Sequence, residues 1–184
     1  MALTTVRSTG ISSLPAISGA NLTSLNASNI ASGTLAAARF SGGKILSVNT
    51  AQVTDSTTGN NTSYAEHDTG LRVSVTPQST SSKFLIEYQT KTRQTATSRF
   101  TSVRIYKSVA GGSFAAIEHD NHAFTGFNVS VSDSHMNLIA KVIHAPSTTS
   151  ALIFTPYVFV NSGDWELGSR AAQHQTNMVV TEYE

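Results

Sequence analysis

Short runs in which hydrophobic and polar residues alternate fill the chain from residue 44 to its end. Leu71, Val73 and Val75 are separated by polar residues, and residues 84–89 repeat the pattern. A period of two residues is typical of β-strands that bury one face. Val, Ile, Thr, Tyr and Phe, which favour strands, are concentrated in these runs. The predicted strands are 44–54, 64–75, 83–94, 99–109, 113–119, 124–131, 136–144, 151–161 and 176–183.

Clusters of turn-forming residues separate these runs, as in residues 55–61 and 161–164. Residues 153–160 are hydrophobic at nearly every position, which predicts a central strand buried on both faces. Eight or nine short strands at this spacing indicate an antiparallel β-sandwich or jelly roll. We therefore expect one all-β domain over residues 44–184.

Residues 21–43 follow a different pattern, in which one hydrophobic residue recurs at every fifth position from residue 25 to residue 40. This spacing fits neither a strand nor an amphipathic helix. One apolar residue in five buries too little area within a single chain to offset the entropy lost on ordering. We therefore expect an extended neck in which copies of the chain, most simply three, intertwine. The residues that would face one another in this neck are Leu22, Leu25, Ile30, Leu35 and Phe40.

The neck also carries a family resemblance. Residues 29–40 read Asn-Ile-Ala-Ser-Gly-Thr-Leu-Ala-Ala-Ala-Arg-Phe, which is similar to the N-I-x-S-G-T-L-x-x-x-R-L/F neck of bacteriophage tail-fibre proteins. The segments 44–48, 68–77 and 79–86 follow in an order that resembles the β-rich tips of such fibres, including those of phages of cyanobacteria and other aquatic bacteria. The resemblance covers roughly residues 20–90 of the chain.

This resemblance implies a homotrimeric virion appendage with three parts. Residues 1–20 would attach to a tail or baseplate protein, residues 21–43 would form the trimeric neck, and residues 44–184 would form a tip that binds a host surface polysaccharide or protein receptor. Two alternatives stay open. The same architecture suits a capsid decoration or head-fibre protein, and the β-domain alone would suit a free lectin-like carbohydrate-binding domain.

Composition narrows the functional classes. The 184 residues carry a formal net charge of +1, and charged residues make up only 12%, about half the usual share. A nucleic-acid-binding protein would show a clustered basic excess, so we expect no nucleic-acid partner. The chain has no cysteine, which excludes disulfides and thiolate metal sites. The first residues lack the apolar core of a signal peptide, so we expect synthesis in the host cytoplasm and a final location in the virion.

Catalytic signals are weak. Gly-x-Ser-x-Gly is absent, and the acidic pair with the closest alternating spacing, Asp164 and Glu166, is explained by chance as readily as by a glycosidase site. His119, Asp120 and His122 lie close together but lack further metal ligands nearby. We therefore expect no enzymatic activity, no metal and no cofactor.

Aromatic residues near turns are the better receptor-binding candidates, because sugar rings stack on aromatic faces while polar neighbours bind the hydroxyl groups. A single tryptophan in a β-sandwich is more often part of the core, and this alternative stays open for Trp165. The candidate residues are Trp165, Phe124, Phe127, His122 and Asn121.

The middle of the chain is locally basic. If strands 83–94 and 99–109 formed a hairpin, some of these cations would share one face and contact an anionic polysaccharide. The alternative is an ordinary solvated strand face. The basic residues are Lys91, Arg93, Arg99, Arg104 and Lys107.

Overall fold

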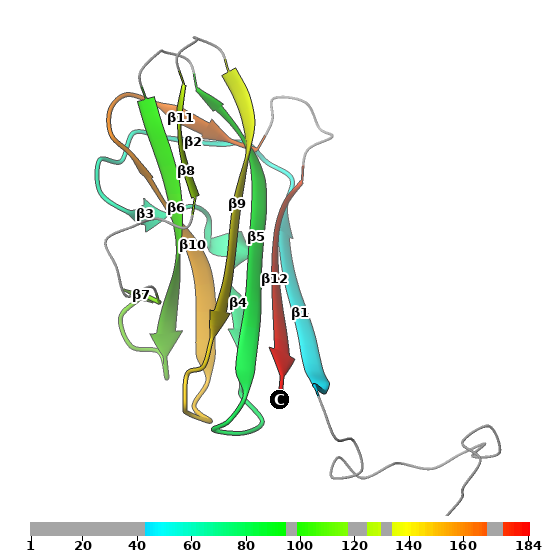
Figure 1. Cartoon of the computed structure of the whole chain (residues 1–184). Helices are drawn as coiled ribbons and strands as arrows, with labels where there is room; N and C mark the ends of the chain where they lie inside the picture. Colours follow the sequence, from blue (N-terminus) through cyan, green and yellow to red (C-terminus); the bar gives the residue numbers. More distant parts are fainter. Residues whose placement is uncertain (1–42, 95–98, 118–124, 130–133, 169–174) are drawn as a thin grey trace, which may run out of the picture. The chain divides into compact units, whose positions relative to one another are not determined.

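The computed structural model describes residues 43–94, 99–117, 125–129, 134–168 and 175–184 (Figure 1). Residues 41–184 form one compact unit. The predicted attachment segment 1–20 and the five predicted neck residues, Leu22, Leu25, Ile30, Leu35 and Phe40, lie outside the described residues, so the neck stays a prediction.

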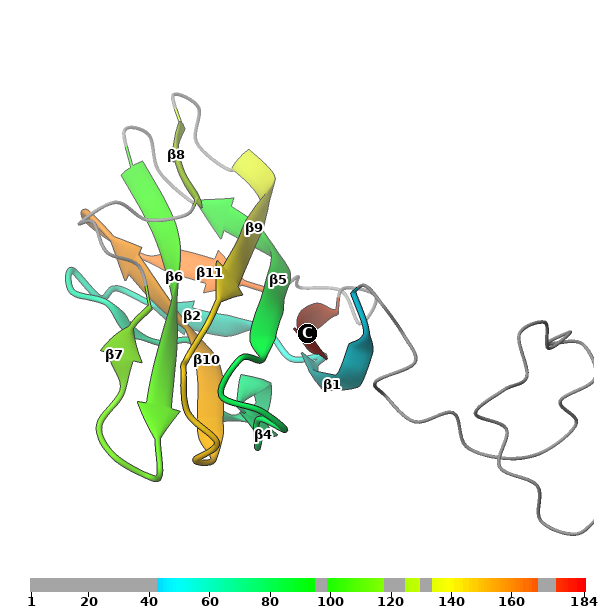
Figure 2. The same ribbon diagram turned by 60° about the horizontal axis from the view of Figure 1, so that its bottom comes forward.

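Sheet 1 contains six strands, and its central strand is β5. β9 pairs with β5 along its whole length on one side, while β12 and then β11 pair with it on the other. β1 pairs with β12, and β2 pairs with β11. All of these pairings are antiparallel, and Figure 2 shows β1 beside β12 at one side of the sheet. The strands are β1 (Ile45–Val53), β2 (Thr57–Gly59), β5 (Lys83–Gln94), β9 (Ser134–His144), β11 (Trp165–Leu167) and β12 (Thr176–Tyr183).

Sheet 2 also contains six strands and is built around the antiparallel pair β6 and β10. β3 and β4 pair with the free side of β10, and β7 and β8 pair with the free side of β6. Each long strand is therefore completed by two short ones. The strands are β3 (Ala65–Glu66), β4 (Val73–Val75), β6 (Arg99–Val109), β7 (Ala115–Ala116), β8 (Thr125–Val129) and β10 (Leu152–Val160).

The core lies between the two sheets, where alternate residues of the long strands meet. Phe84 of β5 and Phe154 of β10 are fully buried, and their ring centroids lie 5.6 Å apart. Leu71, Val73 and Val75 are buried while the polar residues between them are exposed, as their alternation predicts. The predicted all-β antiparallel sandwich is thus confirmed, and the described residues contain no α-helix.

The two ends of the sandwich differ in what they carry. Lys44 and Glu184 exchange two backbone hydrogen bonds of 3.1 and 3.0 Å, which places the point where residues 1–42 join the domain beside the C-terminus. We call this the proximal end. At the other end of β5, the distal end, Gln94 pairs with Trp165 of β11, which pairs with Gly59 of β2. Figure 1 shows β2 and β11 at the end of the domain opposite to the C-terminus. The two ends are roughly 36 Å apart, at about 3.3 Å per residue of β5.

Two predicted elements need correction. The predicted strand 64–75 is divided into β3 and β4 by a 3-10 helix, Thr69–Leu71, because the Asp68 carboxylate accepts a hydrogen bond of 2.7 Å from the Gly70 amide and caps that turn. Residues 57–59 and 165–167, which the turn composition marked as irregular or left unassigned, form β2 and β11. These short strands exist because they pair with each other and with β5, which is information that their own residues do not carry.

The hairpin proposed for the basic residues is wrong, because β5 belongs to sheet 1 and β6 to sheet 2. The cations are therefore distributed over the molecule. Arg93 forms an ion pair with Glu166, the Arg104 guanidinium lies over the ring of Tyr64, and Lys107 contacts His144.

Candidate functional site

A polar hollow of about 460 Å³ opens at the distal end of the domain. It is formed where β2 and β11 pair beside the last residues of β5, so three separate stretches of the sequence contribute to it. Its residues offer amide, hydroxyl, carboxylate and guanidinium groups around one aromatic side chain. The lining residues are Thr58, Gly59, Asn60, Arg93, Asp164, Trp165 and Glu166.

Trp165 forms the apolar part of this hollow but is not an open platform, because only 3% of it is exposed. Its six-membered ring lies over Gly59, where a Cβ atom would come within 2.4 Å of the indole, so only glycine fits there. The His67 ring meets the indole edge-on with the centroids 6.0 Å apart. Within the described residues the buried indole Nε1 has no hydrogen-bond partner.

Glu166 holds the floor of the hollow together. Its Oε2 accepts a hydrogen bond of 3.2 Å from the Arg93 guanidinium, and its Oε1 accepts one of 3.1 Å from the Ser56 hydroxyl. Both members of the ion pair are mostly buried, with 18% of the Arg93 and 11% of the Glu166 side chain exposed. Because both carboxylate oxygens are engaged, Glu166 links β11 to β5 and to the segment before β2.

The two carboxylates beside the hollow have different surroundings. Asp164 lies in the exposed turn before β11, while Glu166, two residues further on, is buried and hydrogen-bonded by Arg93 and Ser56. Asn60 and Thr58 are exposed and present an amide and a hydroxyl beside the hollow. Amide, carboxylate and hydroxyl groups around a partly apolar lining match the alternating hydroxyls and C–H faces of a saccharide.

Of the predicted receptor-binding residues, the structure places Trp165 in the hollow. Phe127 lies in β8, where it pairs with Thr101 of β6. Asn121, His122 and Phe124 lie outside the described residues, so the predicted grouping of these residues around Trp165 stays a prediction. Gly59 and Asn60 were not among the candidates, and Arg93 was one only as a member of the basic set, since their approach to Trp165 depends on strand pairing between distant segments.

The outer face of sheet 2 holds a second feature that the sequence did not reveal. Six half-buried rings form a continuous layer, in which Tyr106 and Tyr157 stack with centroids 3.9 Å apart. Tyr64, which precedes β3, covers this face and shares a hydrogen bond of 2.8 Å with the Ser102 hydroxyl. We call this set the aromatic layer. It consists of Phe114, Tyr157, Tyr106, Tyr64, Phe159 and Phe100, joined by successive ring contacts of 3.9–6.4 Å.

Two guanidinium groups lie over rings of the aromatic layer. Arg104 lies 4.4 Å from the centroid of the Tyr64 ring and Arg72 lies 5.1 Å from that of Phe114. Arg72 also forms a two-pronged ion pair with Glu66, and this hydrogen bonding holds the pKa of the Glu66 carboxyl below its usual value. The predicted burial of residues 153–160 on both faces is therefore only partly realised, because Tyr157 and Phe159 are half-buried in this layer.

Two histidines in the described part of the chain, His67 and His144, contact neighbouring side chains within the domain. His67 is buried, and its Nδ1 shares a hydrogen bond of 2.9 Å with the Tyr88 hydroxyl. Burial lowers the pKa of His67 to about 4. Among the described residues no group of three or more His, Cys, Asp or Glu side chains is arranged to hold a metal ion, while His119, Asp120 and His122 lie outside that range. The helices searched there include none long and apolar enough to cross a membrane.

Comparison with known proteins gives distant structural neighbours only. No protein-family model and no curated protein matches the chain. A chain from the infectious bursal disease virus Gt strain is similar over 75% of this chain and 37% of its own length, with 8% identity and a TM-score of 0.47. Eiger TNF from S. frugiperda is similar over 74% of this chain and 92% of its own length, with 7% identity and a TM-score of 0.43.

A chain from the infectious bursal disease virus Gx strain is similar over 75% of this chain and 38% of its own length, with 9% identity and a TM-score of 0.38. The chain therefore spans less than half the length of these two viral chains.

Proposed function

We propose that the chain is a structural virion appendage, a bacteriophage tail fibre whose β-sandwich binds a receptor on the host surface. Residues 1–20 attach it to a tail or baseplate protein, and residues 21–43 join three copies in a neck. The receptor is a surface polysaccharide bound in the distal hollow. The mechanism is adhesion, with no bond made or broken and no cofactor needed.

The position of the hollow is the observation that carries this proposal. It lies at the distal end, roughly 36 Å along β5 from the proximal end at which residues 1–42 join the domain. A fibre must present its receptor site away from its attachment point, and the polar hollow lies at the opposite end of the domain from the point where residues 1–42 join it.

The chemistry of the hollow supports a saccharide. Asn60, Thr58 and Asp164 are exposed hydrogen-bonding groups at the lining of the hollow. Each such contact contributes about 1 kcal/mol, so a single site would bind weakly. Three tips on one neck and several fibres on one virion would raise the overall affinity by multivalency.

Glycan-array binding of the full-length chain tests the site. Replacing Asn60 by alanine (Asn60→Ala) should weaken binding to the recognised glycan about tenfold, because one or two hydrogen bonds are lost. Asn137→Ala is the matched control. Asn137 is also an exposed asparagine but lies on β9 outside the hollow, so this variant should bind as the unaltered chain does. Glycan binding that is unaffected by Asn60→Ala and by Asp164→Asn would contradict the assignment of the site.

Electron microscopy of antibody-labelled virions distinguishes attachment to the tail from attachment to the head. Antibody against the full-length chain should decorate the tail. Decoration of the capsid would favour the head-fibre alternative, and a secreted monomer that binds glycans without any virion would favour the free lectin-like domain.

A further inference from the structure

The outer face of sheet 1 exposes hydrophobic side chains in an unusual concentration. Of the six large hydrophobic residues that are exposed in the described part of the chain, four lie on this face. Ile143 is 65% exposed, Ile45 64%, Val48 57% and Ile139 46%. Contiguous exposed hydrophobic surface on a soluble domain usually marks a contact with another molecule.

Strand register shows that these side chains are neighbours. Val48 pairs with Thr181, Thr181 with Leu85, and Leu85 with Ile143, so the four form one row across the sheet. Gln89 and Ile139 are paired two rows further on, with Val179 in the row between. We call this surface the apolar face and define it by Ile45, Val48, Leu85, Ile139, Ile143 and Val179.

An irregularity in β1 places two of these residues on the same side. Residues three apart on a regular strand point to opposite faces, yet Ile45 and Val48 are both highly exposed. The register shifts between Ile45 and Ser47, as a β-bulge does, and this shift turns Ile45 to the outer face with Val48. The bulge adds a hydrophobic side chain to the surface instead of hiding it.

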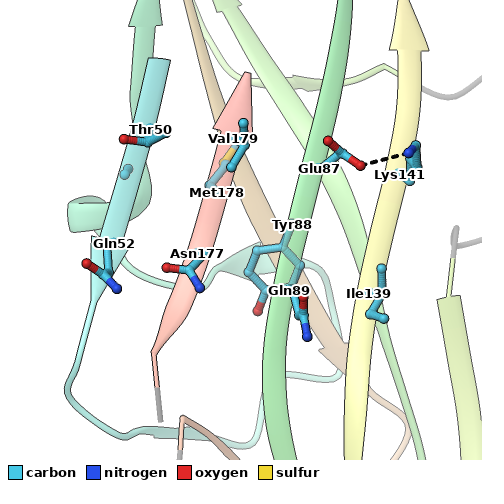
Figure 3. Close-up of a pocket in the computed structure, with 11 residues that line it drawn as sticks. Thr50, Gln52, Glu87, Tyr88, Gln89, Ile139, Lys141, Asn177, Met178 and Val179 are labelled. Atoms are coloured by element: carbon cyan, nitrogen blue, oxygen red, sulfur yellow. Dashed lines mark ion pairs between the residues drawn. The ribbon is translucent and has the colours of Figure 1, made fainter. Parts of the chain in front are cut away.

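The centre of the apolar face carries no net charge, because its two charged side chains are paired with each other. Its central charges, Glu87 and Lys141, form an ion pair of 2.8 Å across β5 and β9 (Figure 3). Lys83 and Lys91 lie at its two margins along β5. A shallow hollow of about 500 Å³ runs over the middle of the face between β1 and β9. A protein surface of aliphatic side chains fits such a face better than a charged polysaccharide does.

The position at which residues 1–42 join the domain suggests which molecule covers the apolar face. Residue 44 directly precedes Ile45, so the most hydrophobic row lies near the proximal end, and the rows become more polar toward the distal end. Any other copy of the chain that is held by residues 1–42 would be tethered beside this row. We propose that a second copy of this chain packs on the apolar face. This inference rests on the proposed function, since it requires the copies to be joined through residues 21–43.

The size of the face explains why the tether is needed. It spans four strands at about 4.8 Å spacing and six residues at about 3.3 Å, which gives a projected area of roughly 300 Å². A stable interface usually buries about 800 Å² on each partner. The apolar face is therefore too small to hold two free domains together, and it serves where the neck raises the local concentration of the second copy.

Site-specific labelling of the full-length chain tests the proposal, because the chain has no native cysteine. Ile143→Cys and Val109→Cys each introduce one thiol, and maleimide labelling rates are measured alongside the mass in solution. In a single subunit the thiol at position 143 should react faster, since Ile143 is 65% and Val109 39% exposed. If a second copy covers the apolar face, the order of the two labelling rates is reversed. The thiol at position 143 then reacts about tenfold more slowly than it would in a single subunit, and more slowly than the thiol at position 109.

The outcomes separate this inference from the proposed function. A trimeric mass with slow labelling at position 143 supports both. A trimeric mass with faster labelling at 143 than at 109 overturns the apolar-face contact and leaves the neck intact, whereas a monomeric mass overturns the neck and the contact together. Protection that appears only when glycan or lipid vesicles are added would also overturn the proposal. Val48→Cys gives a second position on the same face should Ile143→Cys fail to fold.

Discussion

The outer faces of the two sheets both carry hydrophobic side chains, but they differ in how far the chain itself covers them. In sheet 2 the chain covers its own outer face, because Tyr64 and Phe114 lie over the rings of β6 and β10 and form the aromatic layer. In sheet 1 no such cover is present over the described residues, and Ile143 and Val48 stay more than half exposed. The difference fits the proposal that sheet 1 is covered by a second copy of the chain, whereas the rings on the outer face of sheet 2 are covered within one subunit.

The energetics of the two faces follow from this difference. Each ring pair of the aromatic layer contributes about 0.5–1.5 kcal/mol beyond its buried area, and this stabilisation is present in a single chain. The apolar face contributes almost nothing until a partner removes it from water. Changes to the aromatic layer should therefore act at any protein concentration, whereas changes to the apolar face should act only when copies associate.

The largest effect on stability is expected from lowering the pH, because acid protonates a histidine that links the two sheets. His67, next to β3, shares its Nδ1 hydrogen bond with Tyr88 of β5, and burial holds its pKa at about 4. Between pH 6.5 and 4 the unfolded chain binds a proton at this residue that the folded chain does not bind. The free energy of unfolding should thus be highest above pH 6.5 and fall toward pH 4, by on the order of 3 kcal/mol.

Urea unfolding at pH 7 and pH 4.5 measures this dependence. His67→Gln should reduce it, while His135→Gln, which replaces an exposed histidine, should leave it unchanged. Part of the dependence should survive in His67→Gln, because burial and Lys107 also lower the pKa of His144 to about 4. Identical pH dependence in all three proteins would show that His67 does not carry the effect. Both sheets should unfold in one transition, since the histidine joins them.

Removal of one ring from the aromatic layer should give the next largest effect. Tyr157→Ala deletes the stack with Tyr106 and the contact with Phe114, and should lower the free energy of unfolding by about 2–3 kcal/mol at every protein concentration. Ile139→Ala on the apolar face is the control and should cost less than about 1 kcal/mol in dilute solution. Equal losses for the two variants would remove the contrast between the faces.

The sequence predicted the long strands better than the short ones. The expected runs 83–94 and 99–109 coincide with β5 and β6, because long runs of strand-favouring residues carry a signal of their own. β2 and β11 escaped prediction because three residues carry no periodicity, and their strand character comes from pairing with β5. The hairpin failed for a related reason, since local pattern does not show when the chain passes from one sheet to the other.

Only part of the candidate site could be predicted in the same way. Trp165 was a candidate because tryptophan is rare and lies next to a turn, and the alternative that it is mostly buried agrees with its 3% exposure. Gly59 has no distinguishing feature in the sequence, yet its missing side chain makes room for the indole. The bulge that turns Ile45 outward was equally hidden, since it is visible only as a shift in pairing with β12.

A smaller effect should follow from changing one cation of the aromatic layer. The planar guanidinium of Arg104 lies 4.4 Å from the centroid of the Tyr64 ring, and an ammonium group does not reproduce this stacking. Arg104→Lys should therefore lower the free energy of unfolding by about 1 kcal/mol. Lys141→Arg, which keeps the charge of an exposed residue on the apolar face, should change it by less than about 0.5 kcal/mol. A stability loss for Lys141→Arg that matches that of Arg104→Lys would argue against a specific stacking contribution.

The smallest effect, and the most discriminating, is expected for Ile143→Thr. Threonine keeps the branched Cβ that favours strands, so the variant should unfold within about 0.5 kcal/mol of the unaltered chain at low protein concentration. At high concentration, where copies associate, loss of the hydrophobic side chain should lower the unfolding temperature by a margin that grows with concentration. Val109→Thr, which changes an exposed valine of sheet 2, should show no such growth. If the two variants respond to concentration in the same way, sheet 1 needs no partner, and the difference between the two outer faces is one of composition alone.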